Sequence, residues 1–206
     1  MKQKPGWVLP DLKEAQKRTT NTIDRIDTFT IPEVARMMGR GKTYFISTYG
    51  CQANERDSET LAGILDELGF TPNETAEGSD VIIINTCAIR QNAEEKVLGE
   101  IGNFKRLYRE NKDLIIGVCG CMAQEEGLVE TLLTKYPQVR LLFGTHNIQE
   151  LPSMLYSCMF EGKKVVKIYS KEGEVYENLP VHRFGTFKAW VNIMYGCDKF
   201  CTYCIV

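Results

Sequence analysis

Six of the eight cysteines in this 206-residue chain fall into two patterns that could bind metal. Three of them, Cys197, Cys201 and Cys204, form the C-x3-C-x2-C segment near the carboxyl end of the sequence. Three closely spaced thiolates can hold a four-iron cluster while one iron stays open. Such an iron can chelate S-adenosylmethionine, and an electron from the cluster can cleave its sulfonium to give a 5′-deoxyadenosyl radical. Zinc bound by the same thiols is the main alternative.

The second pattern consists of three single cysteines, each of which follows an expected β-strand. Cys51 follows the strand at 44–48, Cys87 follows 81–85, and Cys121 follows 114–118. Because the carboxyl ends of parallel strands share one edge of a sheet, and ligands bind beyond that edge, these thiols should converge. Three thiolates favour an iron–sulfur cluster over structural zinc, which takes four ligands. Three unrelated buried cysteines are the alternative interpretation.

The elements that would position these cysteines are short apolar strands alternating with amphipathic helices. The expected strands are 44–48, 81–85, 114–118 and 139–143, and helical patterns cover 61–68, 97–108 and 128–133. This alternation predicts an α/β fold with an open, mostly parallel sheet and flanking helices. After residue 158 two extended segments follow. A further strand is expected in FKAWVNIMYGC, with Trp190 packed in a core.

The chain divides into three expected parts: an extension at 1–42, an α/β domain at 43–180, and the start of a further domain at 187–206. Within the extension, Thr30 and Glu33 form a capping-box pattern that predicts a helix ending near Gly39.

Composition excludes some classes of protein and favours one compartment. The net charge of −2 carries no basic excess of the kind that a nucleic-acid-binding chain shows. The apolar run at 81–84 is far too short to span a membrane, and the amino-terminal residues show no secretory signal. A cytoplasmic location is therefore expected. Thiols stay reduced there, so metal ligation is favoured over disulfides.

Several residues near the cysteines have competing interpretations. Cys119 is a possible fourth ligand but is expected to be buried within its strand, and Cys158 is expected in the core. Asn54 and Asn85 either donate hydrogen bonds to cluster sulfurs or cap helices. His146 is expected to lie in a turn.

A set of motifs in this order resembles the radical S-adenosylmethionine methylthiotransferases. The motifs are TYGCQANERDSE, NTCAIRQNAEEKV, GVCGCMAQ, GTHNIQELP and VNIMYGCDKFCTYCIV, and the resemblance runs from about Thr43 to Val206. Gln52 after Cys51, together with NTCAIR, is similar to the MiaB-type tRNA enzymes. Ala53 departs from the methionine that is common in that type.

The resemblance implies two [4Fe–4S] clusters and S-adenosylmethionine as cofactors. Cys197, Cys201 and Cys204 would hold the radical-generating cluster, with Tyr203 near the adenine of S-adenosylmethionine. Cys51, Cys87 and Cys121 would hold an auxiliary cluster that carries or supplies sulfur. The implied reaction adds a methylthio group to C2 of N(6)-isopentenyladenosine beside the anticodon. The implied partners are tRNA and a reductant such as flavodoxin or ferredoxin, without a membrane.

The family continues into a radical barrel and a small tRNA-binding domain, which this sequence does not reach. We therefore expect a fragment of a longer enzyme that does not turn over by itself. Two other functions stay open on the residues alone. One is a non-catalytic iron–sulfur protein that transfers electrons, and the other is a zinc-binding interaction module.

Overall fold

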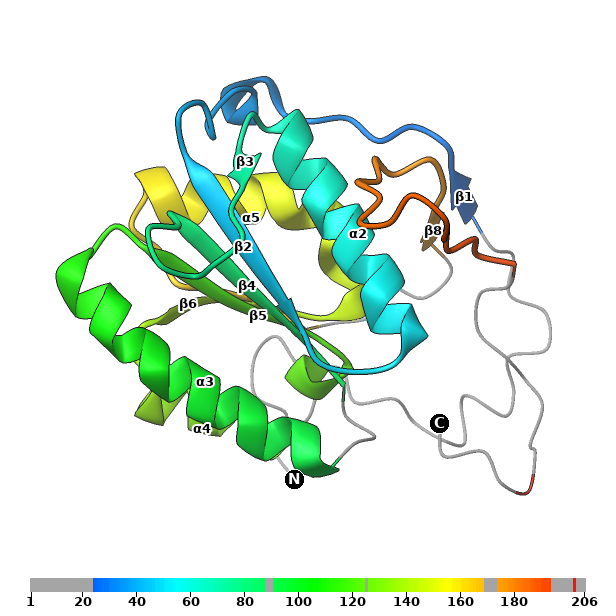
Figure 1. The fold of residues 1–206 in the computed structure, drawn as a ribbon. Helices are drawn as coiled ribbons and strands as arrows, with labels where there is room; N and C mark the ends of the chain where they lie inside the picture. Colours follow the sequence, from blue (N-terminus) through cyan, green and yellow to red (C-terminus); the bar gives the residue numbers. More distant parts are fainter. Residues whose placement is uncertain (1–23, 88–90, 125, 169–173, 194–201, 203–206) are drawn as a thin grey trace.

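A parallel six-stranded sheet forms the centre of the molecule (Figure 1). The computed structural model describes residues 24–87, 91–124, 126–168, 174–193 and 202. The strands of the sheet lie in the order β3-β2-β4-β5-β6-β7, and every neighbouring pair is parallel. They are β2 (Thr43–Thr48), β3 (Thr71–Pro72), β4 (Val81–Thr86), β5 (Ile115–Gly120), β6 (Val139–Phe143) and β7 (Val165–Lys167). The predicted open parallel sheet is confirmed.

The central strands β4 and β5 are buried along their whole length. Helices cover both faces of the sheet, so successive side chains of these strands meet apolar groups on opposite sides. Ile83 packs with Leu61 and Leu65 on one face, whereas Ile82 and Ile84 belong to the core of the other. This two-sided burial explains why the sequence of β4 is a continuous apolar run rather than an alternating one.

Two helices cover each face of the sheet. On one face lie α2 (Gln52–Glu67) and α5 (Leu151–Phe160), and on the other lie α3 (Gln91–Glu110) and α4 (Glu126–Lys135). Short 3-10 helices follow two strands at their carboxyl ends, namely η2 (Cys121–Gln124) after β5 and η3 (Thr145–Glu150) after β6. The helical patterns read from the sequence are thus confirmed as the elements that connect the strands.

The prediction of a helix between Thr30 and Gly39 is wrong. Only one 3-10 turn, η1 (Glu33–Ala35), forms there, and its N-cap is Pro32 without a side-chain cap. The backbone leaves the helical path because Arg36 is extended and Met37 has a φ of 61°. Phe29 and Ile31, just before this turn, pack against the core on the α2 and α5 face.

A separate pair of short strands joins distant parts of the chain. β1 (Asp24–Ile26) pairs in parallel with β8 (Glu174–Tyr176). After β8 the chain passes beside α2 without regular structure as far as residue 193 (Figure 1). In the described part, 187–193, the strand expected in FKAWVNIMYGC is therefore absent.

Trp190 also does not pack in a core, contrary to the prediction. The neighbouring side chains of Phe187 and Val191 are 101% and 74% exposed. The Lys188 ammonium lies 4.2 Å from the centroid of the Trp190 ring. Because none of the described strands pairs with this segment, its alternating apolar residues have no sheet face to cover.

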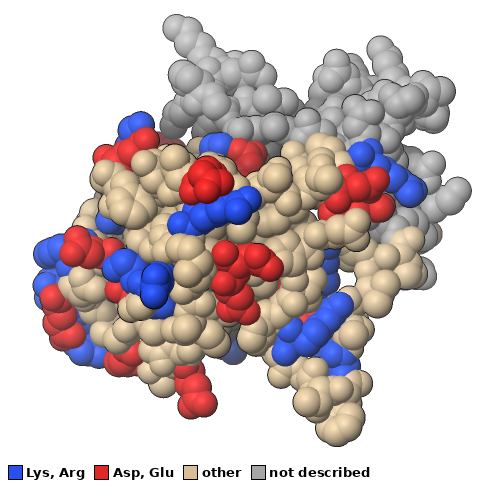
Figure 2. Space-filling view, turned by 90° about the horizontal axis from the view of Figure 1, so that it is seen from above, with Lys and Arg blue, Asp and Glu red and all other residues tan. Residues whose placement is uncertain are grey.

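Acidic and basic side chains are interspersed over the face shown in Figure 2, without one continuous basic patch. This distribution agrees with the net charge of −2. None of the helices in the described ranges is long and apolar enough to cross a membrane.

Candidate thiol site at the carboxyl edge of the sheet

The three single cysteines lie where neighbouring strands end. Thr48 of β2 is in register with Asn85 of β4, and Thr86 of β4 with Gly120 of β5. From β2 the chain passes through α2 to β3, which flanks β2 on the side away from β4. From β4 it passes through α3 to β5, which flanks β4 on the side away from β2. This reversal is a topological switch point, where ligands bind in open α/β sheets.

Each cysteine occupies a defined position beyond its strand. Cys51 is the N-cap of α2 and is half-buried, Cys87 directly follows β4 and is buried, and Cys121 begins η2 and is exposed. The pKa of the Cys121 thiol is raised, first because of desolvation and then by the charges of Cys87, Asp57 and Cys51. The strands that precede the three cysteines are direct neighbours in the sheet, in the order β2-β4-β5.

Among the described residues, no three His, Cys, Asp or Glu side chains are placed to hold a single metal ion. A tetrahedral zinc site needs tight convergence, because each sulfur lies about 2.3 Å from the metal. An iron–sulfur cluster is larger and is held by thiolates, which are soft ligands. The thiolates of Cys51, Cys87 and Cys121 are therefore ligands of the kind that such a cluster takes.

Two glycines allow the strand ends to approach each other. A Cβ atom on Gly50 would lie 2.2 Å from Asn54 Oδ1 and 2.7 Å from the Cβ of Cys87. Gly120 has a φ of +98°, and a Cβ there would lie 2.1 Å from the carbonyl oxygen of Thr86. Any side chain at either position would push the neighbouring segment away. The glycines thus bring the residues before Cys51 and Cys121 against the end of β4.

Asn54 and Asn85 join the start of α2 to the end of β4. Asn54 Oδ1 accepts the backbone N–H of Cys51 at 3.1 Å, and its amide nitrogen donates to the carbonyl of Thr86 at 2.8 Å. The Asn85 amide donates to the Asn54 carbonyl and to Ser58 Oγ, at 2.8 and 3.0 Å. Both side chains are 1% exposed. Both amide groups donate to oxygen atoms in this structure. The capping interpretation is confirmed for Asn54, whereas it is wrong for Asn85, which lies within β4.

Asp57 is a buried carboxylate in this region that the sequence analysis did not identify. It is 9% exposed, and Arg56 Nη1 lies 2.8 Å from its Oδ1. Its pKa is raised because desolvation outweighs the opposing charges of Arg56 and His146. His146 itself lies exposed in η3. No local pattern marks Asp57, because its neighbourhood depends on elements that meet only in the folded chain.

The remaining predicted site residues divide into two groups. Cys119 and Cys158 are buried, as expected, in β5 and α5. Burial raises the pKa of the Cys158 thiol to about 11. The terminal residues Cys197, Cys201, Tyr203 and Cys204 lie outside the described residues.

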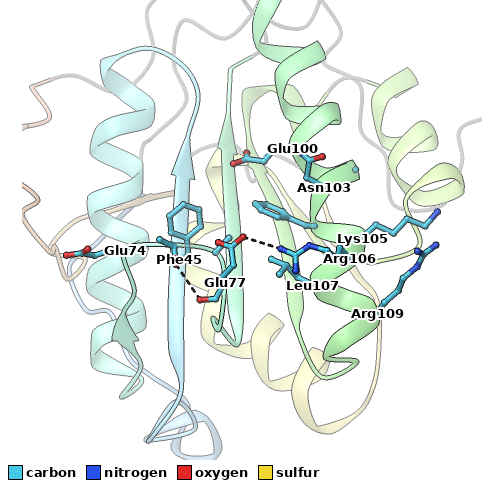
Figure 3. A pocket seen from close by; sticks show the side chains of 13 residues that line it. Phe45, Glu74, Glu77, Glu100, Asn103, Lys105, Arg106, Leu107 and Arg109 are labelled. Atoms are coloured by element: carbon cyan, nitrogen blue, oxygen red, sulfur yellow. Dashed lines mark hydrogen bonds and ion pairs between the residues drawn. The ribbon is translucent and has the colours of Figure 1, made fainter.

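A hollow of about 810 Å³ lies apart from the thiols, between α3 and the loop that precedes β4. Figure 3 shows Phe45, Glu77, Glu100 and Arg106 around it. Arg106 pairs with Glu77 at 3.4 Å, and Ser47 donates to the Glu100 carboxylate at 3.1 Å. The residues that line the hollow include no cysteine or histidine. It does not extend the thiol site.

Comparisons with known proteins cover both the domain and the whole chain. Residues 43–144 match the family described as uncharacterized protein family UPF0004. The chain is 57% and 55% identical, over 197 residues, to proteins named tRNA-2-methylthio-N(6)-dimethylallyladenosine synthase from Staphylococcus saprophyticus and Geobacillus thermodenitrificans. The protein of the same name from Bacillus licheniformis is 54% identical over 200 residues. The first two alignments cover 96% of this chain and 38% of each relative. The chain therefore spans well under half the length of these relatives.

Proposed function

The chain belongs to the family of MiaB-type tRNA methylthiotransferases, and we propose that it contributes the sulfur-supplying part of such an enzyme. The substrate in this proposal is the N(6)-isopentenyladenosine beside the anticodon of tRNA, which is methylthiolated at C2. The names of the relatives support this reaction, since they specify a 2-methylthio product on an N(6)-dimethylallyladenosine.

The observation that carries the proposal is the gathering of Cys51, Cys87 and Cys121 at the carboxyl edge of the sheet. We infer that these residues hold an auxiliary [4Fe–4S] cluster. Each of the three cysteines follows its own strand at this edge, and open α/β sheets bind ligands beyond such an edge. Thiolates are the ligands that iron–sulfur clusters take in proteins.

The other residues of the edge hold the ligands in place. Asn54 fixes the backbone of Cys51 and ties α2 to the end of β4. Gly50 and Gly120 permit the close approach of the three strand ends. Cys87, which is 2% exposed, faces little solvent, and low solvent access affects the reduction potential of a cluster. When bound, the clusters and S-adenosylmethionine supply the sulfur, methyl and radical chemistry that an inert aromatic C–H bond requires.

The rest of the proposal concerns residues outside the described ranges and the partners. Cys197, Cys201 and Cys204 would hold a second [4Fe–4S] cluster, with Tyr203 near the adenine of S-adenosylmethionine. The proposed domains are the extension at 1–42, the α/β domain at 43–180 and the start of the radical domain at 187–206. A flavodoxin or ferredoxin would supply electrons, and a cytoplasmic location stays a prediction.

The first test is the iron and sulfide content of the chain after anaerobic reconstitution, together with its absorption spectrum. We expect a brown protein. The Cys51→Ala/Cys87→Ala/Cys121→Ala variant should lose about half of its iron if each cysteine group holds one cluster. Cys158→Ala is the matched control, because it also removes a thiol but lies in α5, within the core. The control should keep the full iron content.

Each alternative gives a different result in this test. An iron content that the triple substitution leaves unchanged would contradict a cluster at the edge of the sheet. A colourless protein that contains zinc would favour the interaction module. Clusters that titrate reversibly by one electron without cleaving S-adenosylmethionine would favour the electron-transfer protein.

A further inference from the structure

The described part of the amino-terminal extension lies against the carboxyl end of α2. Phe29 and Ile31 pack against the core of the α2 and α5 face. The Gly39 N–H donates to the Leu68 carbonyl at 2.9 Å, and a Cβ on Gly39 would lie 2.1 Å from the ring of Phe70. This close fit anchors the extension directly beyond the last residue of α2.

The segment after β8 is anchored to α2 at a second place. A Cβ on Gly63 would lie 2.5 Å from the backbone of Pro180, and the His182 N–H donates to the Glu59 carbonyl at 2.9 Å. Arg183 Nη1 lies 2.5 Å from Oε2 of Glu59, whose side chain is only 6% exposed. A carboxylate that is removed from water is costly unless it is paired. Because Arg183 supplies this pairing, the anchor holds more firmly than exposed ion pairs would.

The strands β1 and β8 join the extension to the segment after β8. Ile26 is in register with Tyr176, and the Glu177 N–H donates to the Ile26 carbonyl at 3.0 Å. The pair forms a sheet of only two strands, which lie side by side in Figure 1. An isolated pair of strands is at best marginally stable in water, and parallel pairing is slightly weaker than antiparallel pairing. The β1 and β8 pair therefore depends on the two anchors to stay formed.

A hollow of about 630 Å³ lies where the extension, α2 and the segment after β8 meet. Its lining includes Met37 of the extension, Glu67 of α2, and Asn178 and Pro180 after β8. Met37 and Asn178 have φ values of 61° and 59°, and no other described residue except glycine has a positive φ. Such backbone conformations are sparsely populated and cluster where segments clamp or switch. The hollow also means that fewer contacts are lost when the two segments lift from α2.

We propose that the extension and the segment after β8 form a two-part clasp, which opens and closes as one cooperative unit. The clasp consists of residues 24–31 and 174–183. Within the described residues β1 and β8 are each other's only strand partner, so release of either segment removes support from the other. The amino-terminal extension thereby controls when the chain that leaves the α/β fold is held against α2 and when it is free.

Cooperative opening makes a reciprocal prediction. If the two segments were independent, a change at β1 would affect the Glu177 amide alone, and a change at Gly63 would affect the His182 amide alone. In a clasp each change affects both amides, because coupling between two places acts in both directions. The core strands should not respond, since local units open at a lower free energy than the whole molecule.

The test is hydrogen–deuterium exchange of individual amides in the full chain, measured by NMR. Ile26→Pro removes an N–H that faces β8, since the N–H and the carbonyl of one strand residue point to the same side. The Ile26 carbonyl accepts from the Glu177 N–H and so marks that side. We expect exchange of the His182 amide to become about tenfold faster in this variant, because the clasp opens more often.

Arg25→Pro is the matched control. Successive N–H groups of a strand point to opposite sides, so this variant removes one that faces away from β8. Exchange of the His182 amide should stay unchanged. The variant also loses the ion pair of Arg25 with Glu177, at 3.8 Å, but such an exposed pair contributes little.

The reverse measurement starts at the anchor on α2. Gly63→Ala places a Cβ against Pro180, and it should make exchange of the Glu177 amide about tenfold faster. Alanine favours the helix, so α2 itself should stay formed. Gly127→Ala, on α4 with open space around the added Cβ, should leave this exchange unchanged.

The Ile83 amide, in the buried strand β4, reports on the core in every variant. The proposal is overturned if Ile26→Pro leaves exchange at His182 unchanged, or if Gly63→Ala leaves exchange at Glu177 unchanged. It is also overturned if the Ile83 amide accelerates by the same factor, because the clasp would then not open separately from the core. The measurements use metal-free protein, so their outcome is independent of the iron analysis that tests the proposed function.

Discussion

The buried polar side chains near the thiols are occupied by the protein itself. The side-chain amides of Asn54 and Asn85 donate hydrogen bonds to backbone and side-chain oxygens of α2 and β4. Leaving such buried groups unpaired costs about 1–3 kcal/mol each. At the scale of single residues, these asparagines therefore hold the cysteine-bearing segments together and are not free to contact a bound group.

Glu100 shows how partial burial affects a carboxylate away from this site. Its pKa is raised, mainly because desolvation disfavours the charged form, although Tyr49 and Ser47 oppose the shift by hydrogen bonding. A carboxyl group of this kind contributes stability below its unfolded pKa, about 4.3. That contribution is lost as the pH rises through the higher folded value. Glu100→Gln should therefore raise the free energy of unfolding, relative to the unaltered protein, more at pH 7 than at pH 4.

Urea unfolding at the two pH values measures this difference. Glu95→Gln, on the exposed surface of the same helix, controls for the loss of one charge. Glu100 lies at the hollow shown in Figure 3, and the glutamine amide oxygen of the variant could still accept a hydrogen bond from Ser47. An effect of the same size at both pH values would contradict the raised pKa.

At the scale of elements, the ends of β2, β4 and β5 have to meet for the thiols to share a site. Gly120 is the tightest point, because its φ of +98° combines with contact to the Thr86 carbonyl. β5 is buried throughout and has strands on both sides, so it cannot shift to relieve a clash. Glycine is therefore required at position 120 by the close packing of β5 against β4, and not only by the turn that follows β5.

Gly120→Ala should lower the free energy of unfolding by about 2–4 kcal/mol, since it adds backbone strain to a clash. It should also lower iron binding, because it displaces the segment that carries Cys121. Chemical denaturation and iron analysis measure the two effects. Gly99→Ala, at an exposed position of α3 with no atom near the added Cβ, is the matched control. It should stabilise by about 0.5–1 kcal/mol. Equal effects at both glycines would refute this account of the strand ends.

At the scale of the whole molecule, segments far apart in the sequence pack on the α2 side. β1 pairs with β8, and residues 177–192, here called the strap, continue from β8 along α2. At Gly63 the strap backbone packs directly on the helix, so that an added Cβ would lie 2.5 Å from the backbone of Pro180. The helix α2 of the α/β fold and the strap are therefore in direct contact.

Gly63→Ala should loosen the strap without any change of charge. Amide hydrogen exchange at residues 181–183 should become at least tenfold faster, because the added Cβ displaces Pro180 and breaks the hydrogen bond from the His182 N–H to the Glu59 carbonyl. Global stability is a poor readout here, since alanine also favours the helix by up to about 1 kcal/mol. Gly127→Ala, on α4 with open space around it, should leave that exchange unchanged. Protection equal to that of the unaltered chain would show that the strap is not seated on Gly63.

The sequence by itself determined the four long strands of the sheet, the helices between them, and the position of Cys51, Cys87 and Cys121 after three of those strands. Apolar runs and helical periodicities are local signals, and parallel strands necessarily end at one shared edge. The same local reasoning failed at Thr30, where a capping pattern was present but the backbone turned away at Met37. It failed again at Trp190, whose alternating neighbours have no partner strand in the described part of the chain.

Only the tertiary structure decided the contacts that join distant segments. The pair of Asn54 and Asn85, the burial of Asp57 beside the thiols and the bond of Arg183 to Glu59 all depend on elements brought together by folding. Arg183 and Glu59 are 124 residues apart, and no periodicity marks such a pair. The sequence showed which residues could do chemistry, because residue type and spacing along one element are local properties. Which groups surround them, and where the strap runs, follow from the packing of the whole chain.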